Sequence, residues 1–170
     1  QLQKETIEKL PSLKYVVSCS VGINNIDLKE LQKRNIELIH GSGSNANSVA
    51  EHTLYLILSL LRNSSPIAEL KGKTIGIVGL GHIGKVVAKK LLGFGCRIIT
   101  YDVIKQDPQV LKELKVGMKS FKEVMKSDIV TVHVPLNEYT KHLIDERKFS
   151  LLKQGAFFIN TSRAEVIDED

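Results

Sequence analysis

The sequence predicts an α/β protein built on a doubly wound parallel sheet, and two observations lead to this. From residue 67 onward, short runs rich in Val and Ile alternate with helix-like segments, which is typical of a parallel sheet covered by helices on both faces. The first of these runs ends in a glycine turn, Gly79-Leu-Gly-His-Ile-Gly84, that opens a helix. A turn of this kind binds the pyrophosphate of a dinucleotide in the Rossmann fold.

Residues 1–64 are predicted to be part of a substrate-binding (catalytic) domain of flavodoxin-like α/β type. After an initial helix, the expected elements are a strand, a helix and a strand over residues 14–20, 27–34 and 36–40. The loop after the first strand holds Val21 and Gly22 at a strand's carboxyl end, where open α/β sheets bind ligands. On its own, however, this polar loop is better explained as a simple turn.

A helix over residues 48–62 is predicted to join the two parts of the chain. Ser48 and Glu51 have the spacing of a capping box. Apolar side chains occupy nearly every face of this helix, and one domain cannot cover them all. We therefore expect it to be buried between two domains or across the interface of a homodimer.

Residues 65–170 are predicted to form the dinucleotide-binding Rossmann domain, since the polar segment ending at Pro66 marks a boundary. Its expected strands cover residues 74–78, 98–101, 118–120, 129–134 and 156–160. Its expected helices cover residues 83–92, 110–114, 121–126 and 145–152. The third of these helices follows a second capping box, formed by Ser120 and Glu123.

Each glycine of the turn has a physical role in a dinucleotide site. Gly79 permits the sharp turn, Gly81 lets the backbone approach a pyrophosphate, and Gly84 lets helix and strand pack closely. The next strand ends on Asp102, 18 positions after Gly84. A carboxylate there suits the ribose 2′-hydroxyl of NAD and repels the 2′-phosphate of NADP. The sequence therefore predicts NAD as the cofactor.

Two alternatives compete with the dinucleotide hypothesis. Residues 79–85 also fit the phosphate motif G-x-x-x-x-G-K, but Val86 stands where a P-loop needs Ser or Thr to hold Mg²⁺. That motif gives no role to Gly81 or Asp102. A glycine turn that binds nothing is the other alternative; it is favoured over the P-loop but less than the dinucleotide site.

Two further strand ends point to the same edge of the sheet. His133 precedes a proline that stops its strand, and it is equally compatible with a hydrogen-bonded structural histidine and a ligand contact. Arg163 follows an apolar strand by three residues. Its fork of donors matches the two oxygens of a carboxylate.

Composition narrows the function classes further. The net charge of +5 is modest and the lysines are scattered, which favours attraction of small anions over nucleic-acid binding. The two cysteines, Cys19 and Cys96, suggest reduced thiols and a cytoplasmic location. The longest uncharged apolar run, residues 53–61, is too short to span a bilayer. We expect no metal site, nucleic-acid partner or membrane partner.

Five stretches in this order resemble the D-isomer-specific 2-hydroxyacid dehydrogenases, the family of D-lactate, glyoxylate, hydroxypyruvate and 3-phosphoglycerate dehydrogenases. They are Ser48–His52, Gly72–Gly84, Tyr101–Asp102, Ser127–Pro135 and Ile159–Arg163. The resemblance extends over nearly the whole chain from about Leu13. It implies an NAD-dependent enzyme that exchanges a hydride with a small anionic 2-hydroxy or 2-oxo acid.

The resemblance also implies roles for individual residues. Arg163 would be the catalytic arginine and would hold the substrate carboxylate together with the backbone of Val21 and Gly22. For the cofactor, it implies that the pyrophosphate is met by His82 and Ile83 and the adenosine ribose by Asp102. It also implies an adenine-side wall of Val134, Pro135 and Thr140, with Thr161 and Ser162 beside the nicotinamide. The predicted cofactor contacts are completed by the turn residues Gly79, Gly81 and Gly84 and by His133 as a candidate.

The family's acid/base histidine and its glutamate partner are expected downstream of Asp170, because none of the five histidines matches that position. Ala164 and Ser42 depart from the family's usual glycine and proline. We therefore expect the chain to be an incomplete part of a longer enzyme. An NAD-sensing regulator of corepressor type is the alternative function on the same scaffold.

Overall fold

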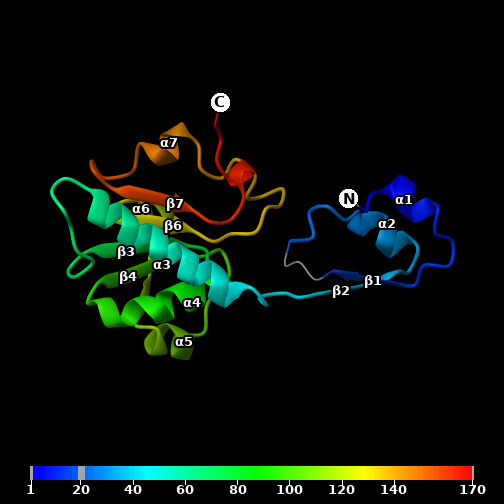
Figure 1. The fold of residues 1–170 in the computed structure, drawn as a ribbon, viewed down its shortest axis with the longest axis horizontal. Coiled ribbons are helices and arrows are strands. Elements are labelled where there is room, and N and C mark those ends of the chain that lie inside the picture. The colour runs from blue at the N-terminus through cyan, green and yellow to red at the C-terminus, as the bar shows by residue number, and fades with distance from the viewer. Residues whose placement is uncertain (1, 19–21, 170) are drawn as a thin grey trace. The chain divides into compact units, whose positions relative to one another are not determined.

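The computed structural model describes residues 2–18 and 22–169 (Figure 1). The chain divides into two compact units, Gln1–Asn45 and Ala46–Asp170. Each unit has its own hydrophobic core.

The first unit contains two short helices and a two-stranded parallel sheet. Its elements are α1 (Lys4–Glu8), β1 (Tyr15–Ser18), α2 (Leu28–Lys33) and β2 (Glu37–His40). Asp27 caps α2, because its carboxylate accepts a hydrogen bond of 3.0 Å from the N–H of Glu30. Among the described residues of this unit, the core is formed by four buried apolar side chains, namely Ile7, Ile26, Leu31 and Ile36. The predicted strand–helix–strand order is confirmed for the described residues.

The second unit is organised around a five-stranded parallel sheet with the order β5-β4-β3-β6-β7. The strands are β3 (Thr74–Val78), β4 (Arg97–Tyr101), β5 (Val116–Met118), β6 (Ile129–Val132) and β7 (Phe157–Asn160). The chain winds outward from β3 in both directions, which makes this a doubly wound Rossmann sheet. The predicted fold class of this part is confirmed. The point where the winding reverses lies between β3 and β6, at the carboxyl ends of these two strands.

Helices cover both faces of this sheet (Figure 1). One core layer joins strand residues such as Ile75 and Ile77 to α3 (Ala46–Asn63), α4 (His82–Leu91) and α5 (Pro108–Glu113). The other layer joins Val130 and Val132 to α6 (Phe121–Met125) and α7 (Glu146–Phe149). Two short 3₁₀ helices, η1 (Leu92–Phe94) and η2 (Ala164–Val166), complete the unit.

Of the two capping boxes predicted at helix starts, one is confirmed and one is wrong. The capping box of Ser120 and Glu123 is confirmed, with both reciprocal hydrogen bonds present. The capping box at Ser48 is wrong, because α3 begins two residues earlier, at Ala46. Glu51 instead accepts hydrogen bonds from Asn47 Nδ2 (2.9 Å) and Lys90 Nζ (3.0 Å).

Predicted strand and helix ends shift by a few residues elsewhere. The strand expected over 118–120 lies at 116–118, and β6 ends at Val132 rather than residue 134. Of the helix expected over 145–152, only the single turn of α7 is helical.

Helix α3 packs against α4 and β7 within the second unit. Its inward face carries Ala50, Ile57 and Leu61, all almost fully buried. Tyr55 remains 64% exposed, and Leu58 and Leu60 are each 37% exposed. Packing within the second unit thus buries one face of α3. Its burial between domains or in a dimer, and a functional boundary at residues 64/65, stay predictions.

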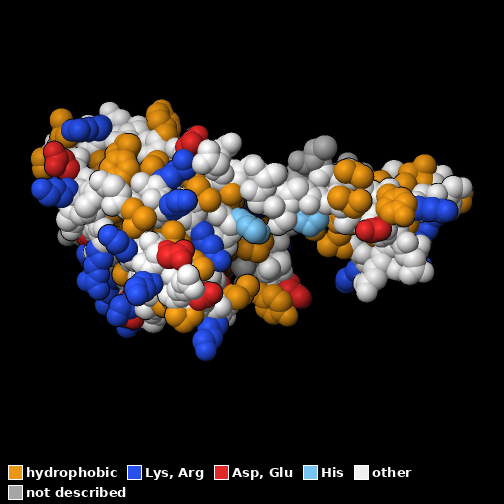
Figure 2. Space-filling view, turned by 90° about the horizontal axis from the view of Figure 1, so that it is seen from below, with side chains coloured by type: hydrophobic (Ala, Val, Ile, Leu, Met, Phe, Trp, Pro, Cys, Tyr) orange, Lys and Arg blue, Asp and Glu red, His pale blue; other side chains and the backbone are white. Residues whose placement is uncertain are grey.

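The visible face of the larger unit carries many Lys and Arg side chains with Asp and Glu among them (Figure 2). None of the helices in the described residues is both long and apolar enough to cross a membrane.

Candidate functional site

The glycine turn follows β3 directly and occupies the reversal point of the sheet. Gly79 has φ = 95°, in the left-handed region that favours glycine. Its N–H donates to the carbonyl of Tyr101 at 2.9 Å. A Cβ on Gly79 would lie only 2.9 Å from the carbonyl oxygen of His133. The turn therefore requires glycine here for both its torsion angle and its close approach to the end of β6.

The other two glycines of the turn have opposite surroundings. Gly84 is buried in the first turn of α4, and a Cβ on it would lie 2.2 Å from the carbonyl oxygen of Gly79. Gly81 is the N-cap of α4, and a Cβ on it would meet nothing within 4 Å. Gly84 therefore serves packing inside the protein, whereas Gly81 borders open space.

The first residues of α4 border this open space, and their backbone N–H groups lack an acceptor within the helix. His82 and Ile83 begin the helix, and the first helical hydrogen bond runs from Lys85 N to Gly81 O at 3.0 Å. The preceding N–H groups have no acceptor within the helix, and the macrodipole adds about half a positive charge at this end. An anion such as a pyrophosphate fits there.

Asp102 lies just after β4 and is fixed by two backbone donors. Its Oδ2 accepts from the N–H of Leu80 at 2.7 Å, and its Oδ1 accepts from the N–H of Ile104 at 2.8 Å. The carboxylate thereby ties the glycine turn to the neighbouring strand end. Each oxygen retains lone-pair capacity for a further donor such as a ribose hydroxyl.

His133 lies on the other side of the reversal point, with its side chain 7% exposed. Its Nε2 is 3.0 Å from the hydroxyl of Thr131, and its Nδ1 is 3.2 Å from the hydroxyl of Thr161. Burial lowers the pKa of His133 to about 4. The ring is therefore neutral near pH 7, and its proposed contact with a cofactor stays a prediction.

The loop after His133 is braced by its own side chains. Thr140 donates its hydroxyl hydrogen to the carbonyl of Pro135, and the same oxygen accepts from the N–H of Asn137 at 2.9 Å. A Cγ of Val134 would lie 2.9 Å from a Cβ on Gly79. Val134 thus lies beside the turn, whereas a cofactor contact for Pro135 and Thr140 remains predicted.

The loop after β7 is held by Asn160. Its Oδ1 accepts from both the N–H (2.9 Å) and the hydroxyl (2.6 Å) of Ser162, and its Nδ2 donates to the carbonyl of Arg163 at 2.8 Å. The exposed guanidinium of Arg163 donates to the carbonyl of Ser162 at 2.8 Å. Among the described residues, no carboxylate pairs with this guanidinium, so most of its donors are available to an anion.

The structure gathers most of the predicted site at one edge of the second unit. The strand ends of β3, β4, β6 and β7 bring the turn, Asp102, His133 and Thr161 to that edge. Gly22 lies in the first unit. Val21 lies outside the described residues.

Two residues that bond to the predicted site residues were not predicted from the sequence. Asn160 has a recognisable signal, because asparagine followed two residues later by a bonded N–H forms an Asx turn. Thr53 on α3 lies 3.2 Å from the Thr161 hydroxyl across 108 residues of sequence, and no local pattern marks it.

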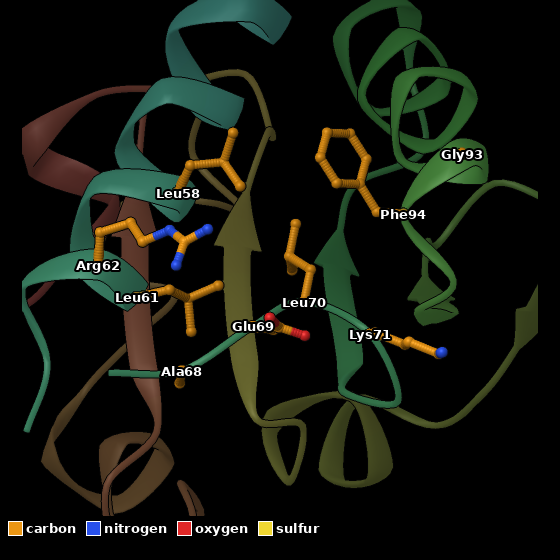
Figure 3. Close-up of a pocket in the computed structure, with 9 residues that line it drawn as sticks. All are labelled: Leu58, Leu61, Arg62, Ala68, Glu69, Leu70, Lys71, Gly93 and Phe94. Carbon is orange, nitrogen blue, oxygen red and sulfur yellow. The ribbon is translucent and has the colours of Figure 1, made fainter. Parts of the chain in front are cut away.

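A pocket of about 320 Å³ lies elsewhere, between α3, η1 and the segment that leads into β3 (Figure 3). Leu58, Leu61 and Phe94 line it together with Arg62 and Lys71. It lies by the amino-terminal end of β3 and contains none of the predicted site residues.

The residues at the carboxyl edge fit a dinucleotide. The open space at Gly81, the free N–H groups of α4 and the fixed carboxylate of Asp102 supply the pyrophosphate and ribose contacts of such a cofactor. Residues 28–170 match the family model described as "D-isomer specific 2-hydroxyacid dehydrogenase, NAD binding domain". The chain belongs to this family. The resemblance drawn from the motifs is confirmed, as is NAD as the cofactor.

Members and solved structures of the 2-hydroxyacid dehydrogenase family match along almost the whole chain. A hydroxypyruvate reductase of Thermotoga maritima is 34% identical over 98% of this chain. A glyoxylate reductase of Thermofilum pendens is 35% identical over 100% of it. The crystal structure of a D-lactate dehydrogenase from Aquifex aeolicus, complexed with NAD and lactic acid, has a TM-score of 0.89 and 36% identity over 98% of this chain. The chain spans only 58%, 56% and 55% of these proteins, respectively.

Proposed function

We propose that the protein transfers a hydride between NAD(H) and a small 2-hydroxy or 2-oxo acid. The observation that carries this proposal is the pairing of the glycine turn with Asp102 at the reversal point of the sheet. A carboxylate held 2.7 Å from the backbone of the turn favours the ribose hydroxyls of NAD over the phosphate of NADP.

Arg163 is the proposed clamp for the substrate. Its exposed guanidinium offers two parallel donors to a carboxylate, which orients the substrate as well as balancing its charge. Val21 and Gly22 are proposed to add backbone donors to the same carboxylate. The matched relatives named for hydroxypyruvate and glyoxylate favour a short, polar 2-oxo acid.

The nicotinamide ring supplies the hydride donor or acceptor when NAD is bound. The protein must bind the 2-oxo acid, orient its reacting carbon and exchange the hydroxyl proton. His133 does not suit the proton exchange, because it is buried and its pKa lies near 4. We propose that a histidine with a glutamate partner, downstream of Asp170, performs this step.

A two-stage experiment tests the proposed function. Fluorescence titration with NADH and NADPH should give clear preference for NADH. NADH consumption by the full-length protein should then be followed with glyoxylate, hydroxypyruvate and pyruvate. Equal affinity for the two cofactors would contradict the role of Asp102. Tight NADH binding without turnover of any 2-oxo acid would favour the regulator, which the enzyme names of the relatives do not support.

We also propose a cytoplasmic homodimer. The exposed apolar side chains of α3 and its following loop, Tyr55, Leu58, Leu60 and Ile67, favour a partner surface. The cytoplasmic location rests on the sequence's two cysteines being reduced thiols; Cys19 lies outside the described residues, and among those described Cys96 is a free cysteine. Light scattering that finds only monomers at micromolar concentration would contradict the dimer.

A further inference from the structure

A line of polar side chains links helix α3 to the two strand ends beside the glycine turn. We call it the threonine–histidine chain, and it consists of Thr53, Thr161, His133 and Thr131. The Thr53 and Thr161 hydroxyl oxygens are 3.2 Å apart, and Thr161 is 3.2 Å from Nδ1 of His133. Nε2 of the ring is 3.0 Å from the Thr131 hydroxyl. Thr53, Thr131 and His133 are buried.

The hydrogen atoms of this chain have one consistent arrangement. The chain starts at the carbonyl of Val49, which can only accept, and the single hydroxyl hydrogen of Thr53 is donated to it at 2.8 Å. Thr53 can therefore only accept from Thr161. Since Thr161 also has one hydroxyl hydrogen, its oxygen must accept from Nδ1–H of His133. Nε2 of the neutral ring then carries no hydrogen and accepts from Thr131.

The threonine–histidine chain bears on the proposed cofactor site, because His133 and Thr161 lie at two of the strand ends that form the site. The carbonyl of His133 approaches Gly79, and Thr161 begins the loop that carries Arg163. A change of hydrogen-bond direction at Thr161 therefore acts on the ends of β6 and β7, next to the glycine turn. Helix α3 sets that direction although it contributes no atom to the predicted cofactor contacts.

We propose that Thr53 is a positioning residue that, through Thr161, locks His133 in the Nδ1–H tautomer and fixes the ends of β6 and β7 beside the predicted NAD(H) contacts Thr161 and Ser162. The tautomer is a property of the free protein. Only the identification of the ligand as NAD(H) rests on the proposed function.

Nitrogen-15 NMR of histidine-labelled, cofactor-free protein reads the tautomer directly. The wild type should show a protonated Nδ1 and a bare Nε2 for His133. In Thr53→Val, a nearly isosteric change, the Thr161 hydroxyl loses its acceptor and turns to donate to Nδ1. The ring proton should then move to Nε2 and be donated to Thr131.

Two control variants separate the hydroxyl from its surroundings. Thr53→Ser keeps the hydroxyl and should retain the wild-type tautomer. Ser59→Ala removes a hydroxyl from the same helix outside the chain and should also leave the tautomer unchanged. If Thr53→Val does not fold, Thr161→Val breaks the same link from the other side and should produce the same shift to Nε2–H.

Titration with NADH supplies the second readout. Thr53→Val should bind NADH about fivefold more weakly, the effect of one typical hydrogen bond, and Thr53→Ser should restore the affinity. A wild type with Nε2–H, an unchanged tautomer in Thr53→Val, or a changed tautomer with unaltered NADH affinity would each overturn the proposal. A wild type that binds no NADH would instead contradict the proposed function, since the tautomer is measured without cofactor.

Discussion

A methyl group on Gly81 should strongly weaken cofactor binding while leaving the fold intact. A Cβ at this N-cap would meet nothing within 4 Å in the free protein. In the proposed complex, the same space holds the pyrophosphate against the first N–H groups of α4. Each hydrogen bond to a charged group contributes about 1.5–3 kcal/mol. Loss of two such bonds in Gly81→Ala should weaken NADH binding by at least about a hundredfold.

Gly84→Ala is the matched comparison, because the same methyl group should there damage the protein itself. Its Cβ would lie 2.2 Å from the backbone oxygen of Gly79, more than 1 Å short of the ordinary contact distance of 3.4 Å. Helix α4 must move away from β3 to relieve this overlap. Overpacking of this kind costs roughly 1–3 kcal/mol or more, so the midpoint of thermal unfolding should fall clearly.

Thermal unfolding and NADH fluorescence titration, run on both variants, separate the two effects. Gly81→Ala should lose no more than about 1 kcal/mol of stability, the usual difference between glycine and alanine at an N-cap. Wild-type NADH affinity in Gly81→Ala would refute the placement of the pyrophosphate. A stability loss as large as that of Gly84→Ala would refute the open space at Gly81.

Three further predictions follow from the same edge of the sheet. Asp102→Ala should weaken NADH binding about tenfold or more and narrow the preference for NADH over NADPH. The reason is that the carboxylate holds the N–H of Leu80 and is proposed to bind the ribose. Paired titrations with the two cofactors measure both effects. Arg163→Lys in the full-length enzyme should lower kcat/KM about a hundredfold by removing the planar fork, while NADH affinity stays at the wild-type value; unchanged steady-state kinetics would mean that Arg163 is only a surface charge. His133 should make stability pH-dependent. Its folded pKa of about 4 lies below the ordinary 6.5, so the unfolded chain binds the proton first and stability falls as pH drops from about 6.5 to 4. The loss should approach about 3 kcal/mol, and denaturant titrations of His133→Gln should lack this slope.

The parts of the site that could be predicted from sequence are those set by neighbouring residues. The turn from β3 into α4 depends on torsion angles and close approaches within residues 79–84, and the motif encodes them directly. Asp102 was predictable because the next strand of a βαβ unit returns beside the first. In both cases the governing distances lie within a short stretch of chain.

Contacts between distant segments were not predictable. Ser48 and Glu51 have a valid capping pattern, but α3 begins at the buried Ala46, and Glu51 pairs with Asn47 and Lys90 instead. Thr53 looks like an ordinary helix residue until the fold brings it to Thr161. From the sequence, His133 could equally contact a ligand or be a hydrogen-bonded structural histidine. Only the packing of the folded protein shows that its side chain is buried.

The small core of the first unit has a consequence for local unfolding of the protein. In the described part of this unit, four buried apolar side chains and a two-stranded sheet give β1 and β2 little resistance to local unfolding. Strands β3 and β6 are buried in the middle of the larger sheet, so their amides exchange with solvent only when the whole unit unfolds. Hydrogen exchange should therefore show two separate classes of amide protons. A dinucleotide bound by the second unit slows the exchange of that unit alone, by mass action.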